Sequence, residues 1–319
     1  MEINSKYLGI ICIALAQVFF TTQDMAIKFI SGNYALHQII LIRASVAILF
    51  TLLVLVPIDG GYKYLLSKRL GLHLLRGFGI VVANLCFFTS LVSLPLAEAV
   101  AIFFIGPLLI TSLSVLLIGE KVGMQSWVAV FVGLIGVLIM LRPGFGVFNP
   151  ASMLPLGAAL AYSLVQIMTR KMGEAEKAST MAFYIQLNLV VVSSLMGLIF
   201  GEGHLADPSE PTLYYLFRPW TFPSWGDTMI IIGLGLINGL AAYFISQAYR
   251  VSKAGIIAPF EYVALPLSIF WSITIFGDWP DILSWLGMVL IAGAGLYVVY
   301  NESVQGRKNI LYGPMPRNR

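Results

Sequence analysis

Glu261 and Arg43 are charged side chains deep within long apolar stretches of the sequence. A charge in hydrocarbon costs roughly 2.5–3.5 kcal/mol on insertion scales, so each needs a partner, a wet cavity or a function. Glu261 follows Lys253, and Arg43 follows Ala35, by about 12 Å of helix, which places both near the middle of a bilayer. Three arrangements stay open. In the first the two side chains pair, which keeps Glu261 ionised, and in the second they lie apart, which lets Glu261 carry a proton. A third is that each snorkels to its nearer interface.

Polar and aromatic side chains in the same stretches could bind a substrate. Gln166 stands out among the amides because an internal repeat, described below, matches it with a second glutamine. Tyr243 adds a hydroxyl at depth, and the Phe103, Tyr262 and Trp271 rings could stack on a planar ligand. The alternative for each is packing between helices. We expect these substrate-binding side chains: Glu261, Arg43, Gln166, Tyr262, Tyr243, Phe103 and Trp271.

The elements that position these side chains are apolar stretches along almost the whole chain. Hydrophobic residues make up 59% and charged residues only 11% of the 319 residues, against roughly 25% charged in an average soluble chain. This excludes a soluble domain and predicts an all-α polytopic membrane protein of the plasma (inner) membrane. Stretches of about 20 residues can cross the hydrocarbon. Ten fit: 7–28, 35–56, 72–94, 97–118, 124–141, 153–169, 179–200, 227–249, 255–276 and 281–300.

Lys and Arg are unevenly distributed among the connections. If both termini are cytoplasmic, the inner segments hold most of these residues, Arg76 among them, and the outer side keeps Lys28, Arg142 and Arg218. This positive-inside pattern predicts cytoplasmic N- and C-termini, with a basic tail over 303–319. Asp24 is expected near the outer end of its span as a structural residue. The net charge of +4 then comes from the cytoplasmic loops, so we expect no nucleic acid as a partner. The expected partners are membrane lipid and a small-molecule substrate. The sequence indicates no oligomeric state.

A weak internal repeat divides the chain into halves. A shift of 143 residues places Gln23 on Gln166, and a shift of about 159 places Pro107 on Pro266. Further matches are Arg43 with Gln186, Gly119-Glu120 with Gly277-Asp278, and Trp127 with Trp285. Five spans per half is an odd number, so the halves would cross the membrane in opposite directions, as in many secondary transporters. We expect repeats over 1–150 and 151–302, with an outer loop insertion over 201–226.

Several short strings resemble the EamA-type members of the drug/metabolite transporter superfamily. They are Leu94-Pro95-Leu96-Ala97, Gly119-Glu120-Lys121-Val122, Arg142-Pro143-Gly144, Ala258-Pro259-Phe260-Glu261-Tyr262 and Gly277-Asp278. The resemblance covers about residues 7–302. It implies ten transmembrane helices in two inverted five-helix repeats, a shared central cavity and transport of small organic metabolites. The string that contains Glu261 is most similar to the branch with S-adenosylmethionine uptake carriers and riboflavin transporters, and the long 201–226 loop departs from the family pattern.

Catalytic and cofactor motifs are missing from the sequence. It has no GxxxxGK[ST] loop, HExxH or GxSxG string, its three histidines (His37, His73 and His204) lie far apart, and Cys12 and Cys86 lie in apolar runs. We therefore expect no enzyme, no metal and no cofactor. The predicted function is secondary active transport by alternating access, coupled to protons or working as an exchanger, with S-adenosylmethionine or riboflavin as substrate candidates. The alternative is a non-transporting membrane scaffold or sensor.

Overall fold

The computed structural model describes residues 2–119, 124–141, 149–252 and 254–312, and these ranges contain helices and no strand. Seven helices there are long and apolar enough to cross a membrane: Leu8–Ile30, Leu36–Ile58, Leu70–Ser90, Leu96–Ile118, Pro150–Met172, Ala178–Phe200 and Trp225–Val251. Shorter apolar helices, Phe131–Met140, Phe260–Phe276 and Ile282–Ala294, lie within the remaining predicted spans. The all-α membrane class is confirmed, and the count of ten crossings stays a prediction.

The helices follow the chain in two series. The first contains α1 (Glu2–Ile30), α2 (Leu36–Phe50) with η1 (Thr51–Leu55) and α3 (Val56–Ile58), η2 (Tyr62–Leu65), α4 (Leu70–Ser90), α5 (Leu96–Phe103), α6 (Gly106–Leu113) with η3 (Ser114–Ile118), and α7 (Met124–Leu141). The second contains η4 (Pro150–Ser152), α8 (Met153–Met172), η5 (Gly173–Ala175), α9 (Ala178–Phe200), α10 (Pro211–Phe217), α11 (Trp225–Val251), α12 (Ala254–Ile257) with η6 (Ala258–Val263), α13 (Ala264–Trp271) with η7 (Ser272–Phe276), and α14 (Ile282–Tyr312).

Some predictions fall outside the described residues. Among the strings that resemble the EamA-type transporters, these are Glu120-Lys121-Val122 and Arg142-Pro143-Gly144. The others are Lys253, from which the depth of Glu261 was counted, and residues 313–319 of the predicted tail.

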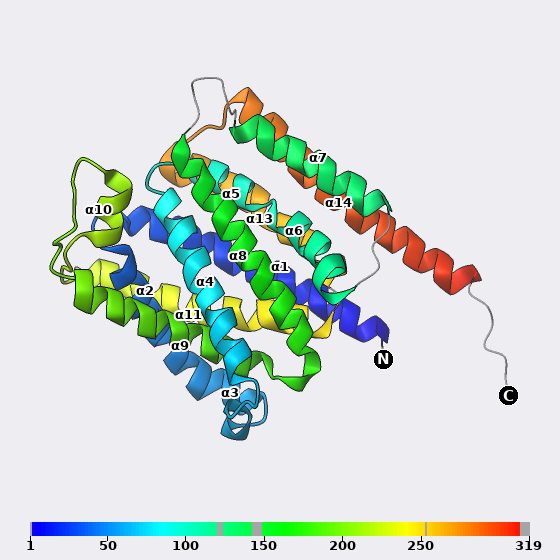
Figure 1. Cartoon of the computed structure of the whole chain (residues 1–319), viewed down its shortest axis with the longest axis horizontal. Coiled ribbons are helices and arrows are strands. Elements are labelled where there is room, and N and C mark those ends of the chain that lie inside the picture. Colours follow the sequence, from blue (N-terminus) through cyan, green and yellow to red (C-terminus); the bar gives the residue numbers. More distant parts are fainter. Residues whose placement is uncertain (1, 120–123, 142–148, 253, 313–319) are drawn as a thin grey trace.

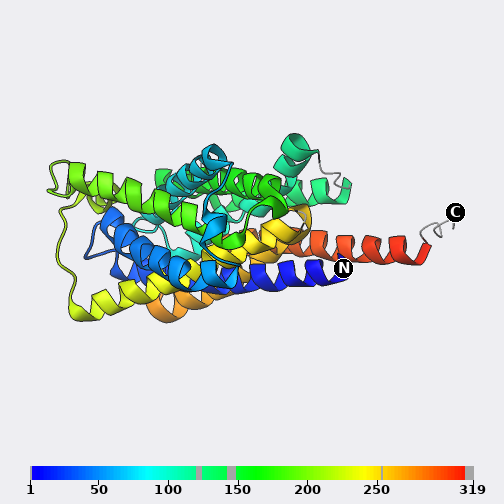
Figure 2. The ribbon, with the colours of Figure 1, turned by 90° about the horizontal axis from the view of Figure 1, so that it is seen from below.

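Helices of the two series pack against one another. α1 runs along α11, α4 along α8 and α9, and α7 along α14, while α2 contacts both α9 and α11. Figure 1 shows α7 and α14 side by side at one edge of the bundle. The start of α1 and the end of α14 lie at the same end of the molecule, where α14 extends beyond its neighbours (Figures 1 and 2). The core is therefore shared between the halves.

Glycines allow α11 to approach α2 closely. A Cβ atom on Gly235 would lie 2.5 Å from the Cβ of Val46 and 2.8 Å from the carbonyl oxygen of Arg43. One turn further along, a Cβ on Gly239 would lie 3.0 Å from the Phe50 ring. Small residues four apart permit such backbone contacts in membrane helices. The contact holds the α2 backbone at Arg43 against α11.

Two helices are broken at matching positions. α5 ends at Phe103 and α6 begins at Gly106, since Pro107 has no N–H and its ring cannot follow a regular turn. In the second half, the six residues of η6 form 3-10 turns, and α13 begins at Ala264, two residues before Pro266. The α6 and α13 helices have starting positions 158 residues apart. The breaks follow from proline in both halves.

The ends of these two helices also match. Each passes into a five-residue π-helical turn, η3 after α6 and η7 after α13. Each then ends at a glycine in the left-handed region, Gly119 with φ 74° and Gly277 with φ 71°. Glycine adopts this conformation without steric cost, so it terminates both helices in the same way.

Candidate functional site

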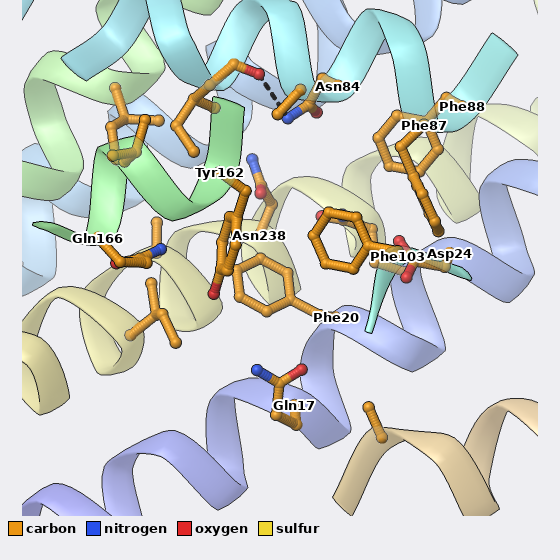
Figure 3. Close-up of a pocket in the computed structure, with 18 of the residues that line it drawn as sticks. Gln17, Phe20, Asp24, Asn84, Phe87, Phe88, Phe103, Tyr162, Gln166 and Asn238 are labelled. Atoms are coloured by element: carbon orange, nitrogen blue, oxygen red, sulfur yellow. Dashed lines mark hydrogen bonds between the residues drawn. The ribbon is translucent and has the colours of Figure 1, made fainter. Parts of the chain in front are cut away.

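A cavity lies between helices of both halves (Figure 3). Its walls come from α1, α4 and α5 of the first half and from α8, α9, α11 and α13 of the second. The empty volume is about 970 Å³, counting the part that is open to solvent. The lining is chiefly apolar, with amides, one acidic and one basic side chain spread over it.

Aromatic rings form one part of the lining. Phe103 is central among them: its ring centroid lies 5.2 Å from that of Phe87 and 5.3 Å from that of Tyr162. In Figure 3 the rings of Phe20 and Phe103 project into the space between α1 and α4. Phe88 and Phe104 complete the set. These rings present faces on which a planar group could stack.

Amides form the polar part of the lining: Gln17, Gln23, Asn84, Gln166, Gln186 and Asn238. Asn238 donates to Gln186 Oε1 at 3.0 Å, and Asn84 donates to the Ile80 carbonyl at 3.0 Å, the dashed line in Figure 3. Gln23 Oε1 and Gln186 Nε2 are buried and have no hydrogen-bond partner. The cavity thus holds an unused acceptor on α1 and an unused donor on α9, which a ligand could satisfy.

Glu261 lies one layer behind the cavity wall. It is 1% exposed. Its Oε1 accepts from the Tyr162 hydroxyl at 3.0 Å and from the Tyr249 hydroxyl at 2.5 Å. Its Oε2 is buried without a partner. Tyr162 lines the cavity and also interacts with the side chains of Gln17 and Gln166, so it connects Glu261 to the cavity.

Arg43 lies elsewhere and does not pair with Glu261. Its Nη2 donates to Asn84 Oδ1, and its guanidinium lies 5.1 Å from the centroid of the Phe88 ring. Its charge interacts with Asp24. Its Nε and Nη1 are buried without partners. Of the arrangements that the sequence left open, the structure therefore has the two charged groups apart, each behind a different part of the cavity wall.

The other predicted site residues divide into two groups. Gln166 and Phe103 line the cavity. Tyr262 lies behind the wall and donates to the Phe104 carbonyl at 3.2 Å. Tyr243 donates to Asp59 at 3.0 Å, and Trp271 packs on Phe270 with ring centroids 5.0 Å apart. Neither Tyr243 nor Trp271 is part of the lining. Their part in binding stays a prediction.

Two charged residues of the cavity wall were not among the site residues predicted from sequence. Asp24, expected near water at a helix end, lies on the wall (Figure 3). Arg76, expected in an inner segment, is 1% exposed and donates to Thr169 Oγ1 at 2.7 Å and Ser246 Oγ at 3.3 Å. For Asp24, helical spacing could have indicated a position on the cavity wall. It lies seven residues after Gln17, and therefore on the same face of the helix.

The connection between α9 and α11 is tied to the first half of the chain. Arg218 donates to the carbonyls of Ser31 and Gly32, the latter at 2.6 Å. Gln38 Nε2 donates to the Thr221 carbonyl at 2.5 Å. Burial lowers the pKa of the Arg218 guanidinium. The predicted insertion is therefore held against the connection between α1 and α2.

No group of His, Cys, Asp and Glu that could hold a metal ion occurs within the ranges that the structure describes.

The first half of the sequence is similar to a known protein family. Residues 7–142 match the EamA-like transporter family. The resemblance to the EamA-type branch of the drug/metabolite transporter superfamily is thereby confirmed. Together with the seven long apolar helices, this match makes the chain an integral membrane protein.

Two relatives are similar over nearly the whole chain. A riboflavin transporter of Vibrio cholerae serotype O1 is 28% identical over 305 residues, which cover 94% of this chain and 95% of the relative. An S-adenosylmethionine uptake transporter of Rickettsia prowazekii is 26% identical over 299 residues, which cover 93% and 94%. A solved crystal structure superposes with a TM-score of 0.68 at 17% identity, covering 95% of this chain and 98% of the other, and shows the same fold.

Proposed function

We propose that the protein is a secondary active transporter that moves a small organic metabolite across the membrane by alternating access. The observation that carries the proposal is the cavity, whose walls come from both halves of the chain. A site at the interface of two repeats can be exposed to either side as one repeat rocks against the other. In this proposal residues 1–150 and 151–302 are the two inverted repeats, crossing the membrane ten times.

Paired contacts support the inverted repeat. The first helix of each half packs along the third helix of the other: α1 along α11, and α8 along α4. The connection after each first helix also reaches the start of that third helix. Tyr34 donates to Asp227 at 2.6 Å, and Glu176 accepts from Ser67, just before α4, at 2.5 Å. A pseudo-two-fold axis between the halves accounts for both sets of contacts.

We propose a substrate that contains a planar nitrogen heterocycle. The Phe20 and Phe103 rings offer stacking surfaces, and the unused acceptor of Gln23 and donor of Gln186 are groups that can pair with a donor and an acceptor on such a ring. The relatives are named for riboflavin and S-adenosylmethionine, and a nitrogen heterocycle is what these two compounds share. Both are therefore substrate candidates for this chain.

The proposal also covers location and energy source. The basic residues favour a plasma (inner) membrane protein with both termini in the cytoplasm. Transport would use an ion gradient or exchange.

Counterflow in proteoliposomes tests the proposal. Vesicles that contain the protein and a high concentration of unlabelled riboflavin or S-adenosylmethionine should take up the labelled compound transiently and saturably. Entry of neither compound, nor of any member of a panel of nitrogen heterocycles, would contradict transport and favour the scaffold or sensor.

A matched pair of variants links the activity to the cavity. Gln166→Ala should raise the half-saturation concentration about tenfold, since a lost hydrogen bond costs about 1.4 kcal/mol at the upper end of its usual range. Thr274→Ala, which changes an exposed side chain that bonds to its own helix, should leave it unchanged. Equal effects of the two variants would contradict a binding role for the cavity.

A further inference from the structure

We propose that Glu261 is a proton-binding site that communicates with the cavity through Tyr162. The inference rests on the proposed transport function and adds the ion that drives it. It starts from one contrast within a single side chain: Glu261 Oε1 has two hydroxyl donors, whereas Oε2 is buried with no partner.

The surroundings of Glu261 supply hydroxyl groups and no ion pair. Within the described residues, the side chains that hydrogen-bond to it are Tyr162 and Tyr249, and Tyr262 is the titratable neighbour in the chain. No basic side chain in those residues forms an ion pair with it. A buried carboxylate without a cation is strongly disfavoured. A proton on Oε2 removes that charge and keeps both hydroxyl donors on Oε1.

The η6 segment is part of the hydrophobic core, since Ala258 and Tyr262, on either side of Glu261 in the chain, belong to its buried clusters. η6 contacts α1, α6, α12, α13 and α14. Among the described residues, the buried members of these clusters on the contacting helices are apolar, and the buried polar side chains of the same helices carry amides or hydroxyls and no charge. A small cation from solution would find the carboxylate and the hydroxyls of Tyr162 and Tyr249 there, whereas metal ions of this kind take six or more oxygen ligands. A proton needs only the one free oxygen.

Tyr162 makes the link to the ligand. Its hydroxyl donates to Glu261 at 3.0 Å, while its ring packs on Phe103, 5.3 Å between centroids, on the cavity wall. Ionised Glu261 holds this hydroxyl. Protonation neutralises the carboxyl group and weakens this hydrogen bond without breaking it, so the hydroxyl interacts more strongly with Gln17 and Gln166, with which it already interacts. The cavity then gains a hydrogen-bonding group for the substrate.

The proton balance is simple. A proton from water adds to Oε2 and forms an O–H bond, and the same proton returns to water on the other side of the membrane when the substrate has left. Nothing is oxidised or reduced. Because coupling between two binding events is reciprocal, substrate binding should cause proton uptake to the same extent as protonation favours binding. The protein would thus move substrate and proton in the same direction.

Infrared spectroscopy of the purified full-length protein tests the site without any substrate. Wild type should show the C=O band of a buried carboxylic acid that disappears as the pH is raised. Glu261→Gln should lack this band. Asp24→Asn, which removes the carboxyl group on the cavity wall, is the matched control and should keep it. Tyr162→Phe should move the frequency of the band, since one hydrogen bond to Oε1 is lost.

Two results would overturn the site. One is a wild-type protein with no titrating acid band over the pH range in which it stays monodisperse, a result that does not depend on how any variant folds. The other is an unchanged band in monodisperse Glu261→Gln. The proposed function fails separately, by the lack of counterflow in wild type, so the two failures are distinguishable.

Discussion

Two irregular segments lead into matching helices but differ in chemistry: the break between α5 and α6, and the 3-10 turns of η6 before α13. Both precede a proline-containing helix that passes into a π-helical turn and a left-handed glycine. At matching positions, 158 residues apart, stand Phe103 and Glu261. One lines the cavity with a ring, and the other lies behind it with a buried carboxyl group. The first half therefore supplies a stacking surface where the second supplies a titratable group.

Contacts between the two breaks explain why they can act together. Tyr262 of the second break donates to the Phe104 carbonyl of the first at 3.2 Å, and the two rings lie 5.6 Å apart. Tyr162 contacts Phe103 with its ring and Glu261 with its hydroxyl. Matching positions in the two halves can therefore carry different groups, here the Phe103 ring and the Glu261 carboxyl group, and still hold them close together. Four predictions test it, from the largest expected effect to the smallest.

Removing the titratable group should have the largest effect. Glu261→Gln should keep counterflow of the labelled substrate but lose uptake driven by an inward proton gradient. A coupling free energy of about 1–3 kcal/mol corresponds to a change of about 5–150-fold in uptake with the gradient. The measurement is initial uptake into proteoliposomes with and without an imposed pH difference. Persistent gradient-driven uptake in the variant would assign the proton to another group.

Removing the ring at the first break should weaken binding without affecting the proton. Phe103→Ala should raise the half-saturation concentration by up to about tenfold, because a stacked ring contributes about 0.5–1.5 kcal/mol beyond the area it buries. The response to the proton gradient should be retained. Phe270→Ala on α13, where the side chain is 52% exposed, is the control. An equal loss in the control would show that the effect is not specific to the cavity.

Removing only the Tyr162 hydroxyl should separate substrate binding from proton coupling. Tyr162→Phe keeps the ring on Phe103 and deletes the hydroxyl that bonds to Glu261. We expect about a fivefold weaker dependence of uptake on the proton gradient, in line with about 1 kcal/mol for one hydrogen bond. Counterflow at saturating substrate should stay close to wild type. Unchanged coupling in this variant would leave Glu261 connected to the cavity by some other route.

Removing the bond between the breaks should affect stability more than transport. Tyr262→Phe deletes the hydrogen bond to the Phe104 carbonyl and should destabilise the protein by about 0.5–1.5 kcal/mol. Thermal unfolding in detergent should show a lower midpoint, and counterflow should be retained. Tyr297→Phe, at an exposed position, should leave the midpoint unchanged. A variant of Tyr262 with wild-type stability but no counterflow would place this hydroxyl in binding instead.

Much of the fold could be predicted from sequence because lipid restricts the choice of structure. Apolar stretches long enough to span hydrocarbon must satisfy their backbone hydrogen bonds internally, which predicts helices. The rise of a helix also gives depth, so Glu261 and Arg43 could be placed near the middle of the chain's spans. Gln166 was singled out by its match to Gln23 in the internal repeat and Phe103 as a ring that could stack on a ligand, and both line the cavity.

The depth of a residue along a helix does not show in which direction around the helix its side chain points. Arg43 and Glu261 lie apart because α2 is held against α11 by Gly235, while the break before α13 sets where the Glu261 side chain points. Asp24 and Arg76 were not predicted as cavity residues for the same reason. The distance of a residue from the helix end does not show which neighbouring helix its side chain faces.

The amino-acid sequence by itself determined that this is an all-α membrane protein, since its apolar content leaves no other stable solution. It also determined where the chain must break, because Pro107 and Pro266 cannot sit in regular helix interiors without cost. Only the tertiary structure decided which side chains share a cavity and that Tyr162 joins Phe103 to Glu261. Those contacts depend on how helices far apart in sequence rotate and pack against each other, and close packing fixes that rotation only when all neighbours are present.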